Sequence, residues 1–379
     1  MPQTGETSRG VARTARRLPL LAVGLLSMAC GLWLGLVRLG WNLPLPWPDQ
    51  LIAHGPLMVC GFLGTLISLE RAVALGARWG YAAPVLTAAG ALALDLGPFG
   101  APGALLVTAG SVVMLAMFVV VWRRQPALFI LTMALGALAW VVGNAFWLGG
   151  ASIFRLVFWW MAFLVLTIAG ERLELNRVLR PTRAVRAWFV AGVVLMLAGV
   201  VVERWRPEPG VRAIGAGLLV LAVWLMRHDV ARRTVRQRGL TRFMAVCLLA
   251  GYVWLGAGGI LALTFAPAMP GTLYDATLHA VFLGFVMSMV FAHAPVIFPA
   301  VLGVPLGYRR AFYVHAAVLH GSLVLRIAGD LVDSLGRWRA WGGLFNAAAL
   351  LLFLVNTGWS IASGRLAAAR GAVGPLSGS

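Results

Sequence analysis

Long apolar stretches follow one another along this chain, and they constrain its fold more than any other feature. They run from Leu18 to about Ile361 and are interrupted only by short loops that contain arginine, glycine or proline. A polypeptide crosses a bilayer as a helix of about 20 apolar residues, because its backbone polar groups must find partners within the segment. With 61% apolar and only 11% charged residues, the chain is predicted to be a polytopic membrane protein.

The predicted fold class is all-α, with twelve transmembrane helices in one bundle. Residues 1–17 are expected to form a basic cytoplasmic segment, residues 18–361 the transmembrane domain and residues 362–379 a cytoplasmic tail. The expected spans cover residues 18–37, 50–70, 80–96, 101–122, 127–148, 153–172, 185–203, 210–227, 242–266, 272–299, 309–331 and 337–361.

The net charge of +19 comes from arginine alone, since the chain has no lysine. If the N-terminus lies in the cytoplasm, most of the 31 arginines fall in cytoplasmic segments, as is typical of membrane proteins. We therefore expect both termini in the cytoplasm and the chain in a bacterial inner membrane. The basic face then lies beside anionic lipid headgroups, which explains the charge without a nucleic-acid partner.

Two expected spans end in similar sequences, TLISLERAVAL at residues 65–75 and LTIAGERLEL at residues 166–175. The two Glu-Arg pairs are 101 residues apart, which corresponds to about four spans. The tenth span begins four spans later and carries His279 at the depth of His54. This spacing suggests three four-helix units. The alternatives are chance similarity and, for the Glu-Arg pairs themselves, solvated helix ends.

Five of the six histidines lie within expected spans, where ionisable side chains are costly and commonly functional; His228 is expected to be exposed in a basic loop. His54 and His279 each lie a few residues after the outer start of a span that runs from the outer face to the cytoplasmic face. Both are therefore expected roughly 6–9 Å below the outer boundary. Two neutral imidazoles at one level can bind an iron from opposite sides, and a b-type haem would hold that iron in a membrane bundle. The alternative for each is a histidine bonded to a nearby carbonyl.

The propionates of a haem need cationic partners at the wetter end of the site. Arg326, near the outer end of the eleventh span, and Arg155, at the outer start of the sixth, are expected at about the right level. The alternatives are an ion pair of Arg326 with Asp330 at i,i+4 and an interface anchor for Arg155.

Three further histidines are expected at the inner face. His293 follows His279 in the same span by 14 residues, whereas His315 and His320 belong to the next span. The spacing of five places His315 and His320 about 140° apart on a helix, so one ion would not bind both. His293 with one of them is a candidate site for copper, another metal or a second haem iron. A proton relay or a structural role is the alternative.

The segments around His54 and His279 resemble a known family. AHGPLMVCGFLGTLISL is similar to the second-helix motif of the NnrS family, and LHAVFLGFVMSMVFAHAP resembles that family's late histidine helix. The twelve-span layout is shared. The resemblance implies a membrane protein that carries haem and copper and is linked to nitric oxide metabolism in denitrifying bacteria, with His54 and His279 as haem ligands. A more distant likeness is to subunit I of the haem–copper oxidases, where His-Gly-x-x-Met in helix two and a histidine in helix ten bind low-spin haem.

The chain also departs from these families. Gly55-Pro56-Leu57 stands where the NnrS motif usually has a second histidine and a carboxylate, and the sixth span lacks the histidines with which an oxidase binds copper. A complete oxygen- or nitric-oxide-reducing centre is therefore not expected, and copper has less support than haem. A diatomic gas or an electron donor remains the expected partner.

Two other functions are compatible with the sequence. The first is a proton-coupled secondary transporter that uses Asp275, Glu70 and the histidines within the spans, since many transporters have twelve spans and internal repeats. The second is an assembly factor that binds a partner subunit in the membrane.

Overall fold

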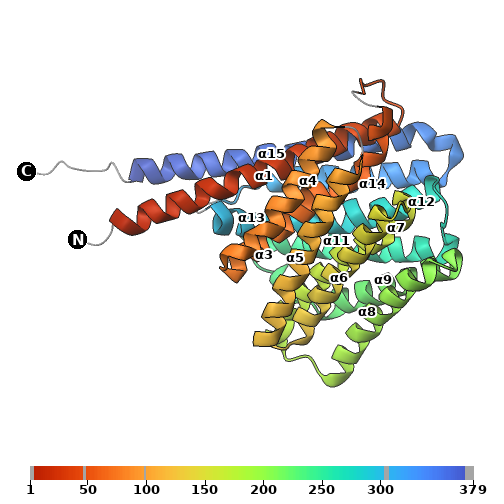
Figure 1. The fold of residues 1–379 in the computed structure, drawn as a ribbon, viewed down its shortest axis with the longest axis horizontal. Coiled ribbons are helices and arrows are strands. Elements are labelled where there is room, and N and C mark those ends of the chain that lie inside the picture. The colour runs from red at the N-terminus through yellow and green to blue at the C-terminus, as the bar shows by residue number, and fades with distance from the viewer. Residues whose placement is uncertain (1–3, 46–47, 98–99, 303–306, 372–379) are drawn as a thin grey trace, which may run out of the picture.

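The computed structural model describes residues 4–45, 48–97, 100–302 and 307–371, which are almost entirely helical (Figure 1). In this part of the chain, eleven helices are long and apolar enough to cross a membrane, which confirms the prediction of an all-α multi-pass membrane protein. The longer elements are α1 (Thr4–Arg38), α3 (Thr65–Leu75), α4 (Ala82–Leu96), α5 (Ala101–Arg124), α6 (Leu128–Leu148), α7 (Ile153–Leu175), α8 (Arg183–Glu203), α9 (Pro207–His228), α11 (Gly239–Phe265), α13 (Ser288–Leu302), α14 (Phe312–Leu331) and α15 (Gly336–Gly371).

Short elements extend or connect these helices. The second span begins with a 3-10 turn, η1 (Pro48–Ala53), and one α-helical turn, α2 (His54–Pro56); the tenth span begins with α12 (Thr272–His279). The remaining short elements are η3 (Arg78–Tyr81), η4 (Asn176–Leu179), α10 (Ala231–Thr234) and η6 (Asp333–Leu335).

One expected span is shorter than the others. The range 80–96 forms α4, whose 15 residues extend about 22 Å, less than the roughly 30 Å hydrocarbon core of a bilayer. It is consequently not among the eleven spanning candidates, although it packs between α1 and α5 in the same bundle.

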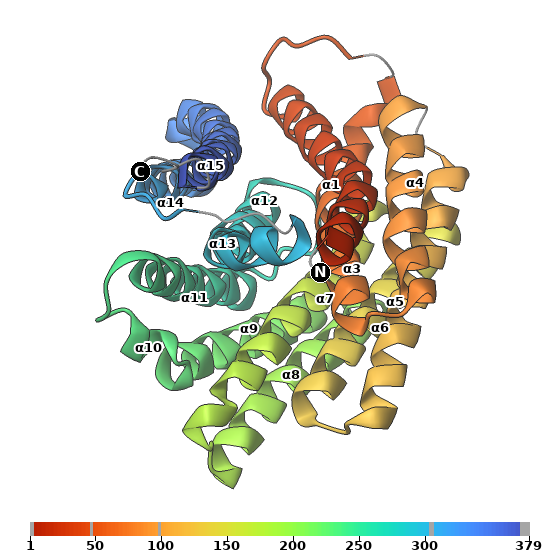
Figure 2. The ribbon, with the colours of Figure 1, turned by 90° about the vertical axis from the view of Figure 1, so that its left-hand side faces the viewer.

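Most consecutive spans pack against each other, and α1 also contacts α13 and α15. Figure 2 shows the bundle from the end at which both termini lie. Close packing of α5 with α6, and of α9 with α11, crosses the boundaries between the three expected four-helix units. The chain therefore forms one bundle. α1 and α15 project from the same end, here called the terminal end, whereas α12 lies towards the opposite, far end (Figure 1).

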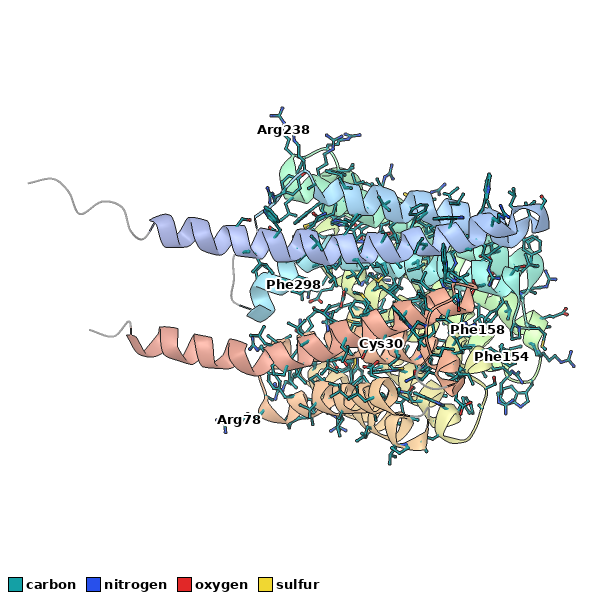
Figure 3. The ribbon with its side chains drawn as sticks, turned by 90° about the horizontal axis from the view of Figure 1, so that it is seen from above. Cys30, Arg78, Phe154, Phe158, Arg238 and Phe298 are labelled. Carbon is teal, nitrogen blue, oxygen red and sulfur yellow. The ribbon has the colours of Figure 1, made fainter. Side chains whose placement is uncertain are left out.

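Arg78 and Arg238 lie near the terminal end, and Phe154 lies near the far end (Figure 3). The end of the bundle expected to be cytoplasmic is thus the terminal end, and the end that carries α12 is the one expected to face outwards.

The second, sixth and tenth spans are the most deeply buried. In their apolar stretches 61, 78 and 67% of the residues are buried, more than in any other candidate span that the structure describes. These are the three spans that the four-span spacing of the sequence relates to one another. Their burial explains why polar groups placed on them meet inside the bundle.

Two of these buried spans contain a π-helical segment that begins within three residues after a histidine. The segments are η2 (Leu57–Gly64), which follows α2, and η5 (Ala280–Met287), which follows α12. A Cβ added at Gly64 would lie 2.6 Å from the Trp140 ring, and one at Gly284 would lie 2.4 Å from the Trp254 ring. Each π segment therefore packs its glycine directly on a tryptophan, and π-helical turns occur frequently at functional sites.

Candidate functional site

His54 and His279 face each other inside the bundle, although they are 225 residues apart in the chain (279 − 54). Their ring centroids are 6.4 Å apart and their planes are inclined by 27°. Bonds from a metal to imidazole nitrogen are about 2.0–2.1 Å long, so two imidazoles on opposite sides of one ion have centroids about 6 Å apart. The centroid spacing of the two rings is therefore close to that of two imidazoles that share one ion.

Both rings are held by backbone carbonyl groups through the same nitrogen. His54 Nδ1 lies 2.7 Å from the Gly31 carbonyl oxygen, and His279 Nδ1 lies 2.8 Å from that of Asp275. A carbonyl can only accept, so we assign the proton to Nδ1 in both neutral rings. Nε2 then carries the lone pair, and no described residue bonds to it in either ring. A histidine that ligates a metal commonly donates its other N–H in this way.

One face of α1 supports His54, a contact that was not predicted from the sequence. Gly31 supplies the carbonyl that accepts from His54, and a Cβ added at Gly35 would lie 2.9 Å from His54 Cε1. Arg38 follows on the same face of the helix, is exposed and has no ion pair with any described residue. The segment Gly31-Leu-Trp-Leu-Gly35 has the GxxxG pattern that lets membrane helices approach closely. This pattern is the sequence feature that could have predicted the contact between α1 and the second span.

A group of four charged residues lies beside His279. Asp275, one turn before His279 on α12, accepts from Arg326 Nη2 at 2.7 Å and lies 3.4 Å from Arg339 Nη2. Arg339 Nε also lies 2.8 Å from Asp330 Oδ1. Arg326 therefore pairs with α12 rather than with Asp330 in its own helix. Its Nε is buried and has no hydrogen-bond partner in the part of the chain that the structure describes.

Arg155 is engaged elsewhere, at the end of α8. Its guanidinium donates to the backbone carbonyl groups of Glu203 and Arg204, both at 2.9 Å, and lies 3.3 Å from Glu203 Oε1. The side chain thus binds the C-terminal carbonyls of a neighbouring helix, where a cation is favoured. It does not join the charged group around Asp275.

The three inner histidines lie in separate environments rather than in one cluster. His293 Nδ1 lies 2.8 Å from the Met289 carbonyl oxygen, which leaves Nε2 with the lone pair, as in His279. His320 Nδ1 instead accepts from Trp254 Nε1 at 3.0 Å. His315 Nδ1 lies 3.1 Å from the Asn356 side-chain nitrogen, and its ring packs against Phe291 at 4.7 Å.

These hydrogen-bond partners determine which of the three histidines has a lone pair free for a metal ion. Indole and amide N–H groups only donate, so Nδ1 of His315 and His320 carries the lone pair and the proton of each neutral ring is on Nε2. Neither ring then has a free lone pair for an ion. Among the residues that the structure describes, no group of three or more His, Cys, Asp or Glu side chains is arranged so that it could hold a metal ion.

The two Glu-Arg pairs of the related sequences TLISLERAVAL and LTIAGERLEL meet near the terminal end. Arg71 binds Glu171 and also lies 3.1 Å from Glu70. Arg172 binds Asp229 through two hydrogen bonds of 2.7 and 2.9 Å, and both side chains are at most 4% exposed. These residues are ion-paired instead of forming the solvated helix ends that are the simplest interpretation of the sequence: Arg172 and Asp229 are buried, whereas Glu70, Arg71 and Glu171 are partly exposed.

A cavity of about 100 Å³ adjoins these ion pairs. It is lined by Glu70, Glu171 and His293 and, apart from Thr167, otherwise by apolar side chains of α1, α3, α7 and α13 and their neighbours. His293 Nε2 is free of described hydrogen-bond partners, so one lone pair and two carboxylates border a largely apolar space. This is an arrangement that can hold a proton or a polar group within the membrane.

Comparison with known proteins places the whole bundle in one family. No curated protein matches this chain. The model of a family described as a domain of unknown function, DUF8744, matches residues 17–362, which include every span and every site residue considered above. The protein therefore belongs to the DUF8744 family and is an integral multi-pass membrane protein of all-α fold.

Proposed function

We propose that this protein binds a b-type haem between Nε2 of His54 and Nε2 of His279. The observation that carries the proposal is the pair of facing rings, 6.4 Å apart, each held through Nδ1 by a carbonyl group. Two imidazole nitrogens are a donor set that would suit a haem iron. The resemblance of both histidine segments to the NnrS family supports the same assignment.

The charged residues near the two rings suit the propionates of a haem. Arg38, Arg326 and Arg339 provide three guanidinium groups against the carboxylates of Asp275 and Asp330. The buried Nε of Arg326 is a donor without a partner among the described residues. Binding an anionic group there would satisfy this donor and balance the excess positive charge.

Held by these two histidines, a haem would supply one-electron transfer. His279 contributes a ring whose orientation is set by the Asp275 carbonyl, and His54 one whose orientation is set by Gly31. Such hydrogen bonds fix a ligand and raise its basicity. We therefore propose that the protein carries electrons in a respiratory or nitric oxide pathway, with an electron donor as its partner.

The orientation in the membrane is part of the proposal. The arginine distribution supports a cytoplasmic terminal end in a bacterial inner membrane, and in that orientation the two histidines lie nearer the outer face. A reporter that is active only in the cytoplasm, fused to the C-terminus, is expected to be active. Activity of a periplasmic reporter at the same position would show that the protein has the opposite orientation.

Optical spectra of the purified protein test the haem directly. Protein produced with ample haem is expected to show a Soret band and reduced-state bands of a low-spin, two-histidine haem. His54→Ala and His279→Ala are each expected to abolish these bands. His320→Ala is the matched control, because this ring lies within the bundle but its Nδ1 is occupied by Trp254. A colourless wild-type protein, or equal loss in the control, would refute the assignment.

A second function, proton-coupled transport, is favoured by the cavity beside Glu70, Glu171 and His293. Two carboxylates that share one guanidinium leave a negative charge that a proton can neutralise. Proteoliposomes with an imposed pH gradient provide the test. Solute-dependent proton flux that is lost in Glu171→Gln, from a protein without haem bands, would favour transport over electron transfer.

A further inference from the structure

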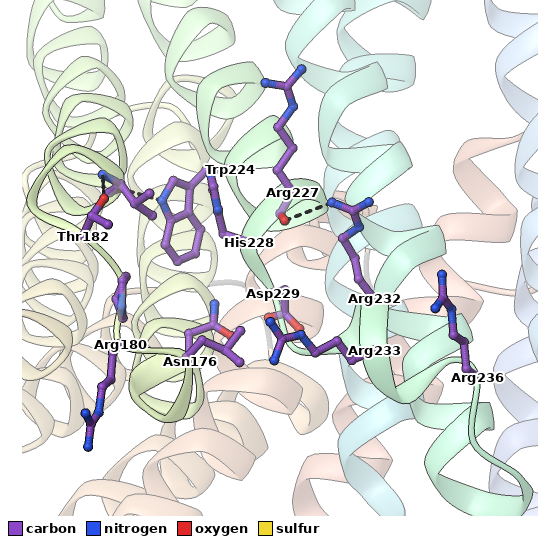
Figure 4. A pocket seen from close by; sticks show the side chains of 13 residues that line it. Asn176, Arg180, Thr182, Trp224, Arg227, His228, Asp229, Arg232, Arg233 and Arg236 are labelled. Carbon is purple, nitrogen blue, oxygen red and sulfur yellow. Dashed lines mark hydrogen bonds between the residues drawn. The ribbon is translucent and has the colours of Figure 1, made fainter.

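A second pocket lies at the terminal end, away from the two facing histidines. It has a volume of about 600 Å³ and is formed by η4, the start of α8, the end of α9 and α10 (Figure 4). Its floor includes Trp224, which is fully buried and donates from Nε1 to the Val185 carbonyl at 2.8 Å. The pocket thus lies where the buried part of the bundle meets its basic end.

Arginine dominates the lining of this pocket. Five of the 13 lining residues are arginines, and all five are exposed: Arg180, Arg227, Arg232, Arg233 and Arg236. None of them forms an ion pair with a described residue. Asp229 is the single carboxylate in the lining, and it is already bound by Arg172. The pocket therefore has a large positive charge that nothing in the described structure compensates.

Backbone groups add to this positive charge. α8 begins beside the pocket, with Thr182 as the N-cap that accepts from Val185 N at 3.3 Å. The first N–H groups of a helix have no partner within it, and its N-terminus favours anions. His228 Nε2, which belongs to another lining residue, is buried and lacks a hydrogen-bond partner among the described residues.

The negative groups near the pocket are largely engaged. The C-terminus of α9 presents carbonyl groups, and the Arg227 carbonyl accepts from Arg232 Nη1 at 3.1 Å. Asp229 Oδ1 accepts a hydrogen bond from Arg172 and a second one from the Ala231 N–H at 2.6 Å. These contacts leave four of the five guanidinium groups without any hydrogen bond to a described residue.

We propose that this pocket binds a phosphate-bearing anion. The planar guanidinium group matches phosphate oxygens with two parallel hydrogen bonds, so several arginines around one space select phosphate over a single carboxylate. Two sources share this chemistry, namely the headgroup of an anionic phospholipid and a soluble diphosphate. Basic pockets between membrane helices on the cytoplasmic side bind such lipid headgroups.

Binding to the full-length protein in a neutral detergent tests the proposal. The probes are short-chain phosphatidylglycerol, the zwitterionic phosphatidylcholine of equal chain length, and inorganic pyrophosphate. The pocket variant is Arg180→Gln with Arg233→Gln. The control variant is Arg78→Gln with Arg123→Gln, which removes the same charge from exposed positions outside this pocket. Because all four side chains are exposed, both variants are expected to fold, and monodispersity with circular dichroism verifies this.

Each arginine near an anionic lipid contributes about fivefold in affinity, so the pocket variant is expected to weaken binding by roughly 25-fold. The control variant should retain the wild-type affinity. Phosphatidylglycerol binding without competition by pyrophosphate identifies a lipid headgroup, and pyrophosphate binding alone identifies a soluble anion. Binding of neither probe, binding no tighter than that of phosphatidylcholine, or equal weakening in the two variants would overturn the proposal.

Discussion

The contact between α1 and His54 leads to a prediction about a single methyl group. In Gly35→Ala, the new Cβ would lie 2.9 Å from His54 Cε1 and 3.1 Å from Nδ1. Carbon atoms in contact normally remain about 3.5–4.0 Å apart. The overlap therefore has to be relieved by movement of α1 or by rotation of the imidazole ring.

Either movement also strains the hydrogen bond between His54 Nδ1 and the Gly31 carbonyl, which is 2.7 Å long. Overpacking in a well-packed interior costs about 1–3 kcal/mol, and loss of a typical hydrogen bond about 1 kcal/mol. We therefore expect Gly35→Ala to destabilise the protein by about 2–4 kcal/mol and to lower haem occupancy, because the His54 ring is no longer held towards His279.

Gly55→Ala is the matched control, since Gly55 directly follows His54. A Cβ at Gly55 would have its nearest neighbours at 3.7 Å in Ile153 and 3.9 Å in Trp160, which is ordinary contact. Thermal unfolding and the ratio of Soret to protein absorbance would be measured for both variants. If Gly35→Ala matches Gly55→Ala in both measurements, the close approach of α1 to His54 is refuted. The unfolding measurement tests this packing even for protein without haem.

Two further predictions concern polar groups inside the bundle. Asp229→Asn removes the negative partner of the buried Arg172, so the free energy of unfolding should fall by about 3–5 kcal/mol; a change below 1 kcal/mol in reversible unfolding in detergent would contradict the buried pair. Tyr274→Phe removes the 2.7 Å hydrogen bond to the Phe154 carbonyl and should cost about 1 kcal/mol, with no change in haem bands. A much larger loss would assign Tyr274 a role beyond joining α12 to α7.

Much of the fold was predictable from local sequence, because each membrane span must satisfy its own backbone and cover itself with apolar side chains. The ranges of eleven spans followed from this requirement alone, and the shorter α4 was located as well. The common level of His54 and His279 in the bundle also followed, since both lie a few residues after the start of spans that run in the same direction. These properties depend on residues that are close together in the chain.

The partners of the polar side chains could not be predicted in this way. Arg326 has a carboxylate one turn away in Asp330, yet it binds Asp275 on another helix. Arg155 binds the end of α8, and the two Glu-Arg pairs bind each other across 100 residues. Helix periodicity specifies which face a residue occupies, but the neighbour on that face depends on how all the helices pack.

The sequence by itself determined that the chain is a multi-pass helical bundle and that two histidines lie at one depth. Only the tertiary structure decided that these two rings face each other, that α1 supports one of them, and that His315 and His320 have their Nδ1 atoms occupied. The physical reason is the range of the interactions. Transfer into the membrane is a property of each segment, whereas hydrogen bonds and ring contacts join atoms from segments that only the packed bundle brings together.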